Sequence, residues 1–152
     1  MDWKQYFRNI AQQIKLKSKD INTKQGAVIV GLDNEIISTG YNSFPRGIND
    51  NLIERQQRPN KYYYFEHAER NSIYNAARIG VSLKNSTMYL TCGIPCADCA
   101  RGIINSGIIK IVCECDDSKI NTGSKLTIWE DHKEHSLQMF KEAGILIEYY
   151  DD

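Results

Sequence analysis

Apolar residues near the start of the chain recur every three or four positions, whereas later ones gather in short runs. The repeat over residues 2 to about 18 predicts an amphipathic helix, because residues with this spacing share one helix face. Its apolar positions are Trp3, Tyr6, Phe7, Ile10, Ala11 and Ile14. The β-branched runs GAVIVG and EIISTGY flank a turn, LDN, and predict a two-stranded hairpin over residues 26–31 and 35–41.

The second half of the chain alternates between helical and strand patterns. The predicted helices span residues 68–80, 96–107 and 133–143, and the predicted strands span residues 86–92, 108–114 and 145–150. This order of elements predicts a single α/β domain, residues 1–152, in which helices cover a mixed sheet.

Residues 42–65 join the two halves and are longer than an ordinary connection. They include Pro45, Gly47 and Pro59, which interrupt regular structure, and they end in the aromatic run YYYF. The length favours a functional lid or binding loop. The aromatic run is expected to pack in the core or the lid, with a shelf for stacking a base as the alternative.

Composition narrows the class of partner. The chain has 152 residues, 41% of them apolar, which suits one domain with its own core. Basic and acidic residues number 19 each, so the positive excess typical of nucleic-acid binding is missing and a small-molecule partner is favoured. No apolar run approaches the roughly 20 residues of a membrane span, and a cytoplasmic protein with reduced, buried or metal-bound cysteines is expected.

Two short motifs carry the candidate chemistry, EHAERN at residues 66–71 and IPCADCARG at residues 94–102. Cys96 and Cys99 are three residues apart at the start of a predicted helix, where both sulfurs can face one point and the helix dipole favours thiolates. His67 begins the preceding helix, and successive helices of an α/β sheet can start at the same edge. Two thiolates and one imidazole are a suitable ligand set for zinc.

Three protein ligands leave the fourth tetrahedral position for water, whose pKa a zinc ion lowers. Glu69 lies two residues after His67, where it can stand beside the ion and carry protons more readily than it can chelate. Two alternatives stay open. Cys92 as a fourth ligand would make the zinc structural, and without a metal the cysteines would be ordinary buried thiols.

These residues carry a family resemblance. HAE at residues 67–69 and PCADC at residues 95–99 match the H-x-E and P-C-x-x-C signature of zinc-dependent nucleobase deaminases. Nearly the whole chain resembles the deoxycytidylate (dCMP) deaminase family in the order and spacing of four longer segments, which are SKDINTKQGAVIV, STGYNSFPRG, HAERNSIYNAAR and PCADCARGIINSGI. The chain departs from the family pattern at two positions. Ser43 stands where glycine is expected, which bears on allosteric regulation. Glu66 places an acid directly before the histidine, which bears on the affinity for a phosphorylated substrate.

The resemblance implies a cytidine-deaminase-like, three-layer α/β/α fold with a mixed sheet of about five strands. It also implies hydrolytic deamination of dCMP to dUMP, with zinc on the three ligands and Glu69 moving the protons. The backbone near Ala68 and the side chain of Asn42 would orient the nucleoside. Family members often form hexamers and respond to dCTP and dTTP, so a homo-oligomer and these effectors are expected.

The substrate-binding residues have alternative interpretations. Asn42 follows a predicted strand and can be a turn residue. Arg46, Lys61 and Arg101 are candidates for holding the 5′-phosphate, although surface cations usually only contact water.

A second zinc site is an alternative for two pairs of residues, Cys113 with Cys115 and His132 with His135. A core strand and a solvated helix face are favoured instead, because residues two apart on a strand point to opposite sides.

Other functions share part of the pattern. A deaminase of another cytosine nucleoside or nucleotide has the same site. A transfer-RNA adenosine deaminase has the same signature but needs a basic surface. A deaminase of riboflavin-precursor pyrimidines usually carries a reductase domain, for which 152 residues leave no room. A non-enzymatic zinc module that holds a partner is the remaining alternative.

Overall fold

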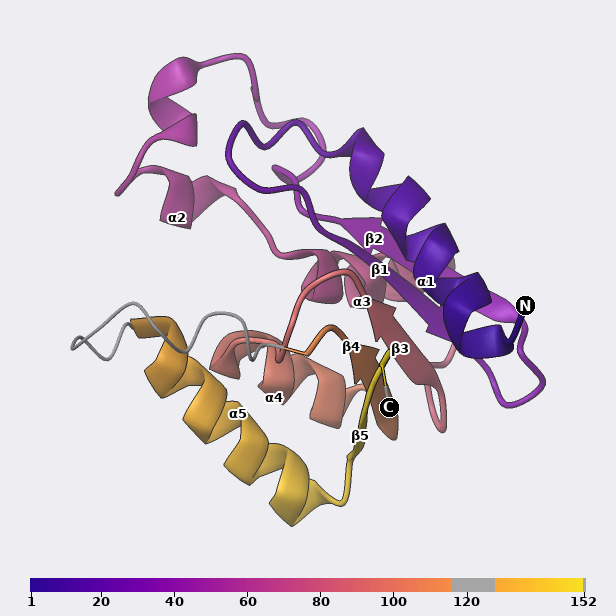
Figure 1. Ribbon diagram of the computed structural model, residues 1–152. Coiled ribbons are helices and arrows are strands. Elements are labelled where there is room, and N and C mark those ends of the chain that lie inside the picture. The colour runs from indigo at the N-terminus through magenta and orange to yellow at the C-terminus, as the bar shows by residue number, and fades with distance from the viewer. Residues whose placement is uncertain (116–127, 152) are drawn as a thin grey trace.

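The computed structural model of the chain describes residues 1–115 and 128–151 (Figure 1). In chain order, its helices and strands are α1 Trp3–Ile14, β1 Gly26–Val30, β2 Ile36–Tyr41, α2 Lys61–Tyr64, α3 Ala68–Ile79, β3 Thr87–Leu90, α4 Ala97–Asn105, β4 Lys110–Cys113, α5 Ile128–Ala143 and β5 Leu146–Tyr149. Two short 3₁₀ helices are η1 Lys15–Lys17 and η2 Ile53–Gln56. Every helix and strand predicted from the sequence is present.

The strands form one mixed sheet in the order β2-β1-β3-β4-β5. β1 pairs antiparallel with both β2 and β3, while β3, β4 and β5 run parallel. A tight turn can join the antiparallel hairpin, whereas the parallel strands need the helical crossovers that α4 and α5 provide. The predicted mixed sheet of about five strands is confirmed.

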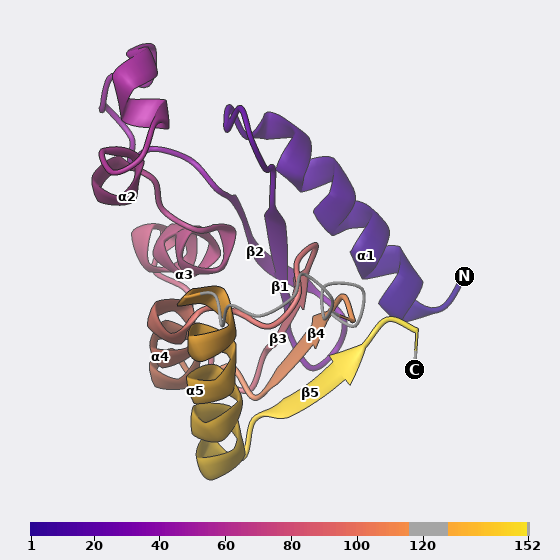
Figure 2. The same cartoon turned by 60° about the vertical axis from the view of Figure 1, so that its left-hand side comes forward.

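Helices cover both faces of this sheet, with α1 on one face and α3, α4 and α5 on the other (Figure 2). Successive strand residues point to opposite faces, so each buried strand contributes to two cores. The core under α1 contains Phe7, Ala11, Val28, Val30, Tyr89 and Val112. The core under the other three helices includes Ala27, Ile29, Met88, Leu90, Ile111 and Phe140. The predicted three-layer α/β/α arrangement is confirmed.

Two regions differ from the predicted boundaries. Helix α5 begins at Ile128, more than one turn before residue 133. Glu130 and Asp131 occupy its first turn, where the helix dipole favours acidic side chains, and the apolar repeat used for the prediction does not extend there. The predicted loop over residues 42–65 contains the short helices η2 and α2.

Candidate metal centre and active site

The structure brings the three predicted ligands together. His67 Nδ1 lies 3.5 Å from Cys96 Sγ and 3.4 Å from Cys99 Sγ, and one ligand atom from each residue falls within 4.8 Å of the others. Both cysteines are buried. Among the described residues, this is the one group of three or more potential ligands with such spacing.

Two helix starts create this convergence. His67 is the N-cap of α3, and Cys96 is the N-cap of α4. Cys96 Sγ accepts a hydrogen bond from the backbone N–H of Cys99 at 3.4 Å, as an N-cap side chain does. The spacing of three residues therefore places one sulfur at the cap and the other in the first turn, on the same side of α4.

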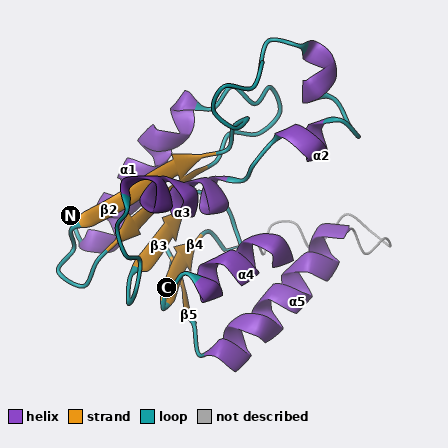
Figure 3. Cartoon of the chain, turned by 180° about the vertical axis from the view of Figure 1, so that it is seen from behind, coloured by secondary structure: helices purple, strands orange, loops and turns teal. Residues whose placement is uncertain are grey.

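Gly40 positions the first turn of α3, which packs against β2 (Figure 3). A Cβ atom at Gly40 would lie 2.4 Å from Ser72 N and 2.8 Å from Ala68 O. Any side chain would therefore push α3 away from the sheet. The glycine in STGY therefore lets the start of α3 pack closely against β2.

The pKa shifts of the three candidate ligands favour the binding of a cation. A hydrogen bond from Cys99 lowers the pKa of Cys96 to about 4, with further lowering by His67, although burial opposes the shift. The same hydrogen bond and burial raise the pKa of the Cys99 thiol. The hydrogen bond to Cys96 raises the pKa of His67. A buried thiolate beside a second sulfur and an imidazole nitrogen is a donor set that fits zinc.

Glu69 lies in the first turn of α3 and is 4% exposed. Burial raises the pKa of its carboxyl group, although His67 lowers it. Its carboxylate is not part of the ligand group. This placement agrees with a proton carrier beside the metal, and that role stays a proposal.

The alternative metal sites are not found in the described residues. Cys92 does not join the ligand group, and the pairs Cys113–Cys115 and His132–His135 take part in no second group there. Cys113 packs in the core under α3, α4 and α5. All five cysteines lie in the described part of the chain, and none forms a disulfide bond.

Glu66 is paired with a cation that the sequence analysis did not consider. Arg70 Nε lies 2.5 Å from Glu66 Oε1, and the two side chains form an ion pair. The geometry of this contact does not meet the criteria for a hydrogen bond. Arg70 Nη1 also lies 3.6 Å from Asp98 Oδ2, in the first turn of α4. The spacing of four residues between Glu66 and Arg70 was the signal in the sequence. The acid before the metal histidine therefore carries little uncompensated charge.

Asn42, the predicted nucleoside contact, is buried and uses its amide inside the protein. Its Nδ2 donates to Thr23 O at 2.8 Å and to Asp20 Oδ2 at 3.2 Å. Its Oδ1 accepts from Gln25 N at 2.8 Å. Both amide N–H groups are engaged, which supports the turn-holding role that the sequence left open. Contact with the nucleoside stays a prediction.

The arginines predicted to hold the phosphate lie in different surroundings. Arg101 in α4 pairs with Asp98. Arg46 Nη2 donates to Asn75 Oδ1 at 2.8 Å, and Arg46 lines an open pocket of about 300 Å³. Arg101 and the three ligands do not line this pocket. The roles of both arginines stay predictions.

Lys61, the third cation considered for the phosphate, forms an ion pair with Asp20. The distance between Lys61 Nζ and Asp20 Oδ1 is 2.9 Å, and the two side chains are 16% and 5% exposed. Asp20 also accepts from the backbone N–H groups of Asn22 and Thr23. Lys61 therefore joins α2 to the loop that follows α1.

A half-buried histidine and two buried cysteines at the starts of two helices, in a three-layer α/β/α fold, are typical of zinc-dependent nucleobase deaminases. Residues 1–115 match the protein family described as the cytidine and deoxycytidylate deaminase zinc-binding region, and the chain belongs to this family. Zinc is accordingly the cofactor of this domain.

Several relatives carry related names. The deoxycytidylate deaminase of Mus musculus is 35% identical over 153 residues, which cover 95% of this chain and 78% of that protein. A probable deoxycytidylate deaminase of Caenorhabditis elegans is 41% identical over 110 residues, and the chain spans about half of its length, 54%. The structure of dCMP deaminase from the cyanophage S-TIM5, in complex with dCMP and dUMP, matches with a TM-score of 0.74 over 96% of this chain and 95% of that one. At 21% identity, this match shows the fold.

Proposed function

We propose that this chain is a zinc-dependent deaminase that hydrolyses dCMP to dUMP and ammonia. The observation that carries the proposal is the group of half-buried His67 with buried Cys96 and Cys99, and the buried Glu69 that interacts with it. The named deoxycytidylate deaminases among the relatives, and the dCMP and dUMP bound by the phage enzyme, support the choice of substrate.

The chemistry follows from the ligands and the buried acid. His67, Cys96 and Cys99 would hold a zinc ion, which when bound would lower the pKa of a water molecule and make it a nucleophile near neutral pH. Glu69 accepts the proton of the water that attacks C4 of cytosine, and it protonates N3 of the ring. It then takes the proton of the new C4 hydroxyl group and delivers it to the amino group, so that the C4–N4 bond breaks, the C4 carbonyl of uracil forms and ammonia leaves. Burial raises the pKa of the Glu69 carboxyl group above its ordinary value, which favours its accepting a proton.

The chain's other residues position the substrate. Ala68, the first residue of α3, lies between the metal histidine and Glu69, where its backbone can orient the ring. Asn42 supports the loop around Asp20 and, by the family resemblance, is the proposed contact of the nucleoside. Arg46 and Arg101 are the proposed cations for the 5′-phosphate. The Arg70–Glu66 ion pair removes the repulsion that an unpaired Glu66 would exert on that phosphate.

Among the described residues, no helix combines the length and the apolar character needed to cross a membrane. A cytoplasmic setting stays a prediction from the sequence pattern. Assembly into a homo-oligomer and control by dCTP and dTTP stay predictions that rest on the family resemblance.

Ammonia release separates this function from its alternatives. The zinc-loaded chain is incubated in parallel with dCMP, deoxycytidine, cytidine and a transfer RNA. Ammonia and dUMP are expected from dCMP at the highest rate. Faster reaction with a nucleoside or with the RNA would overturn the substrate assignment, and zinc binding without reaction in any sample would favour a non-enzymatic zinc module.

A further inference from the structure

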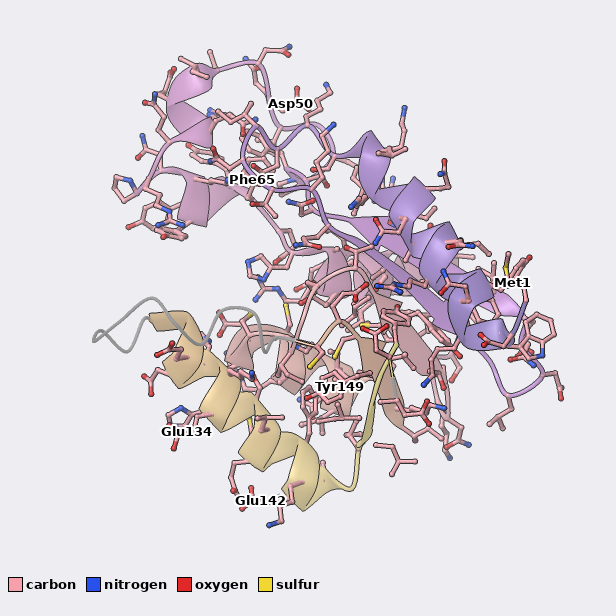
Figure 4. The ribbon with its side chains drawn as sticks, in the orientation of Figure 1. Met1, Asp50, Phe65, Glu134, Glu142 and Tyr149 are labelled. Carbon is pink, nitrogen blue, oxygen red and sulfur yellow. The ribbon has the colours of Figure 1, made fainter. Side chains whose placement is uncertain are left out.

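One face of α5 packs against α4, which carries both metal cysteines (Figure 2). Ser136 and Phe140 on this face are fully buried, and His132 lies one turn before Ser136 in the same row. The acidic residues Glu134 and Glu142 lie on the outer side of α5 (Figure 4). Because α5 starts earlier than the sequence predicted, His132 is inside the helix and faces the start of α4.

His132 makes a specific contact there. Its Nδ1 accepts a hydrogen bond from the backbone N–H of Ala97 at 3.0 Å. Ala97 is the first residue of α4, and a first-turn N–H has no partner within its own helix. The contact joins residues 35 positions apart in the chain.

This contact fixes the peptide group that follows Cys96. The carbonyl oxygen of Cys96 accepts from Ala100 N at 2.8 Å, and its Sγ accepts from Cys99 N at 3.4 Å. Both of those bonds form within α4 itself. The bond from Ala97 N–H to His132 ties the same peptide to another helix, so α5 helps to determine where the Cys96 sulfur points.

We propose that His132 is a positioning residue for the zinc site. It acts through Ala97: by holding the Cys96–Ala97 peptide, it keeps Cys96 Sγ aimed at the metal. Groups that orient metal ligands change metal affinity without touching the ion. This inference rests on the proposed zinc-dependent function and concerns zinc retention.

The test measures how fast zinc leaves the loaded protein for an excess of chelator. His132→Leu and His132→Ala remove the acceptor and are expected to release zinc about 10-fold faster, the lower end for residues that orient ligands. His132→Asn keeps an acceptor oxygen near the place of Nδ1 and is expected to stay within about twofold of the wild-type rate. His135→Leu is the matched control, because His135 is exposed on the same helix and contacts Asp131 of its own helix.

Cobalt(II) substitution provides a spectroscopic readout. The thiolate-to-metal absorption band should change in His132→Ala and His132→Leu, but not in His132→Asn or His135→Leu. Equal zinc release from all variants would overturn the inference, as would release from His132→Asn as fast as from His132→Ala.

The zinc assay contains no nucleotide, so the two proposals can fail separately. A chain that deaminates dCMP but retains zinc independently of residue 132 contradicts only the role of His132. A chain whose zinc release depends on residue 132 but that releases no ammonia from dCMP contradicts only the proposed function.

Discussion

Cys96 and Cys99 are three residues apart yet differ in acidity, because one accepts hydrogen bonds and the other donates them. A hydrogen bond from Cys99 is the main cause that lowers the pKa of Cys96 to about 4. The same bond and burial raise the pKa of Cys99. A divalent cation removes this difference, because it favours the thiolate form of both sulfurs.

We therefore expect Cys99→Ala to lose zinc and stability together, because the free energy of metal binding contributes to folding. Zinc should fall from about one ion per chain to a small fraction, measured by elemental analysis, and the melting temperature should fall with it. Cys113→Ala is the control, since Cys113 is equally buried but belongs to the core. Full zinc in Cys99→Ala would exclude Cys99 as a ligand.

The phosphate should contribute strongly to catalysis, because Arg70 already compensates the charge of Glu66. We expect kcat/KM for dCMP to exceed that for deoxycytidine at least about 100-fold, which corresponds to about 2.7 kcal/mol. Arg46→Ala and Arg101→Ala, assayed with both substrates, show which arginine binds the phosphate. Loss of that arginine lowers kcat/KM for dCMP but not for deoxycytidine. Comparable values for the two substrates in the wild type would leave a nucleoside deaminase.

At the scale of elements, the segment between β2 and α3 is closed at its base, directly before the proposed metal ligand His67. Ser43 N donates to Glu66 O at 3.1 Å, and Glu66 N donates to Ser43 O at 2.9 Å. Inside the segment, the Lys61–Asp20 ion pair attaches α2 to the loop after α1. The long connection is thus held at its base and at α2.

Removing Asp20 should be costly, because Lys61 would keep a largely buried charge without its partner. We expect Asp20→Ala to lower the free energy of unfolding by about 3 kcal/mol, measured by denaturant titration. Lys19→Met is the control: it breaks the exposed Lys19–Asp50 pair and should cost below about 1 kcal/mol. Equal effects of the two substitutions would show that the buried pair does not hold the segment.

The carboxylate of Asp20 should also make the stability of the protein depend on pH. Burial raises the pKa of Asp20, but hydrogen bonds from Asn22, Thr23 and Lys61 outweigh it, so the net shift is downward. Stabilisation by a lowered carboxyl pKa is complete above the unfolded value, about 3.9, and is lost as the pH falls through the folded value. The difference in unfolding free energy between wild type and Asp20→Asn should therefore shrink between pH 6 and pH 3. A difference that grew towards low pH would contradict this sign.

For the whole molecule, local patterns predicted the layers, the sheet and the metal group. The alternation along strands and the helical repeat depend only on residues close together in the chain, so both can be recognised in a single sequence. HAE and PCADC each place ligands at one helix start, and the order of elements brings the two starts together. These features were therefore open to prediction without a structure.

The contacts that support the site were not predictable in the same way. Lys61 meets Asp20 across 41 residues, and His132 meets Ala97 across 35. These contacts depend on how helices and loops pack against one another in three dimensions. A local sequence pattern does not contain that information. The early start of α5 was not predicted either, and it places His132 inside the helix, where it contacts α4.

The most direct test of the account compares dCMP turnover by zinc-loaded wild type and Glu69→Gln at equal zinc content. Wild type is expected to form dUMP and ammonia in equal amounts. Glu69→Gln is expected to keep zinc and the fold but to lose turnover by about 10²–10⁴-fold, because the amide cannot move the protons. A zinc-loaded Glu69→Gln that deaminates dCMP at the wild-type rate, or a variant that arrives without zinc, would contradict the assigned role of Glu69.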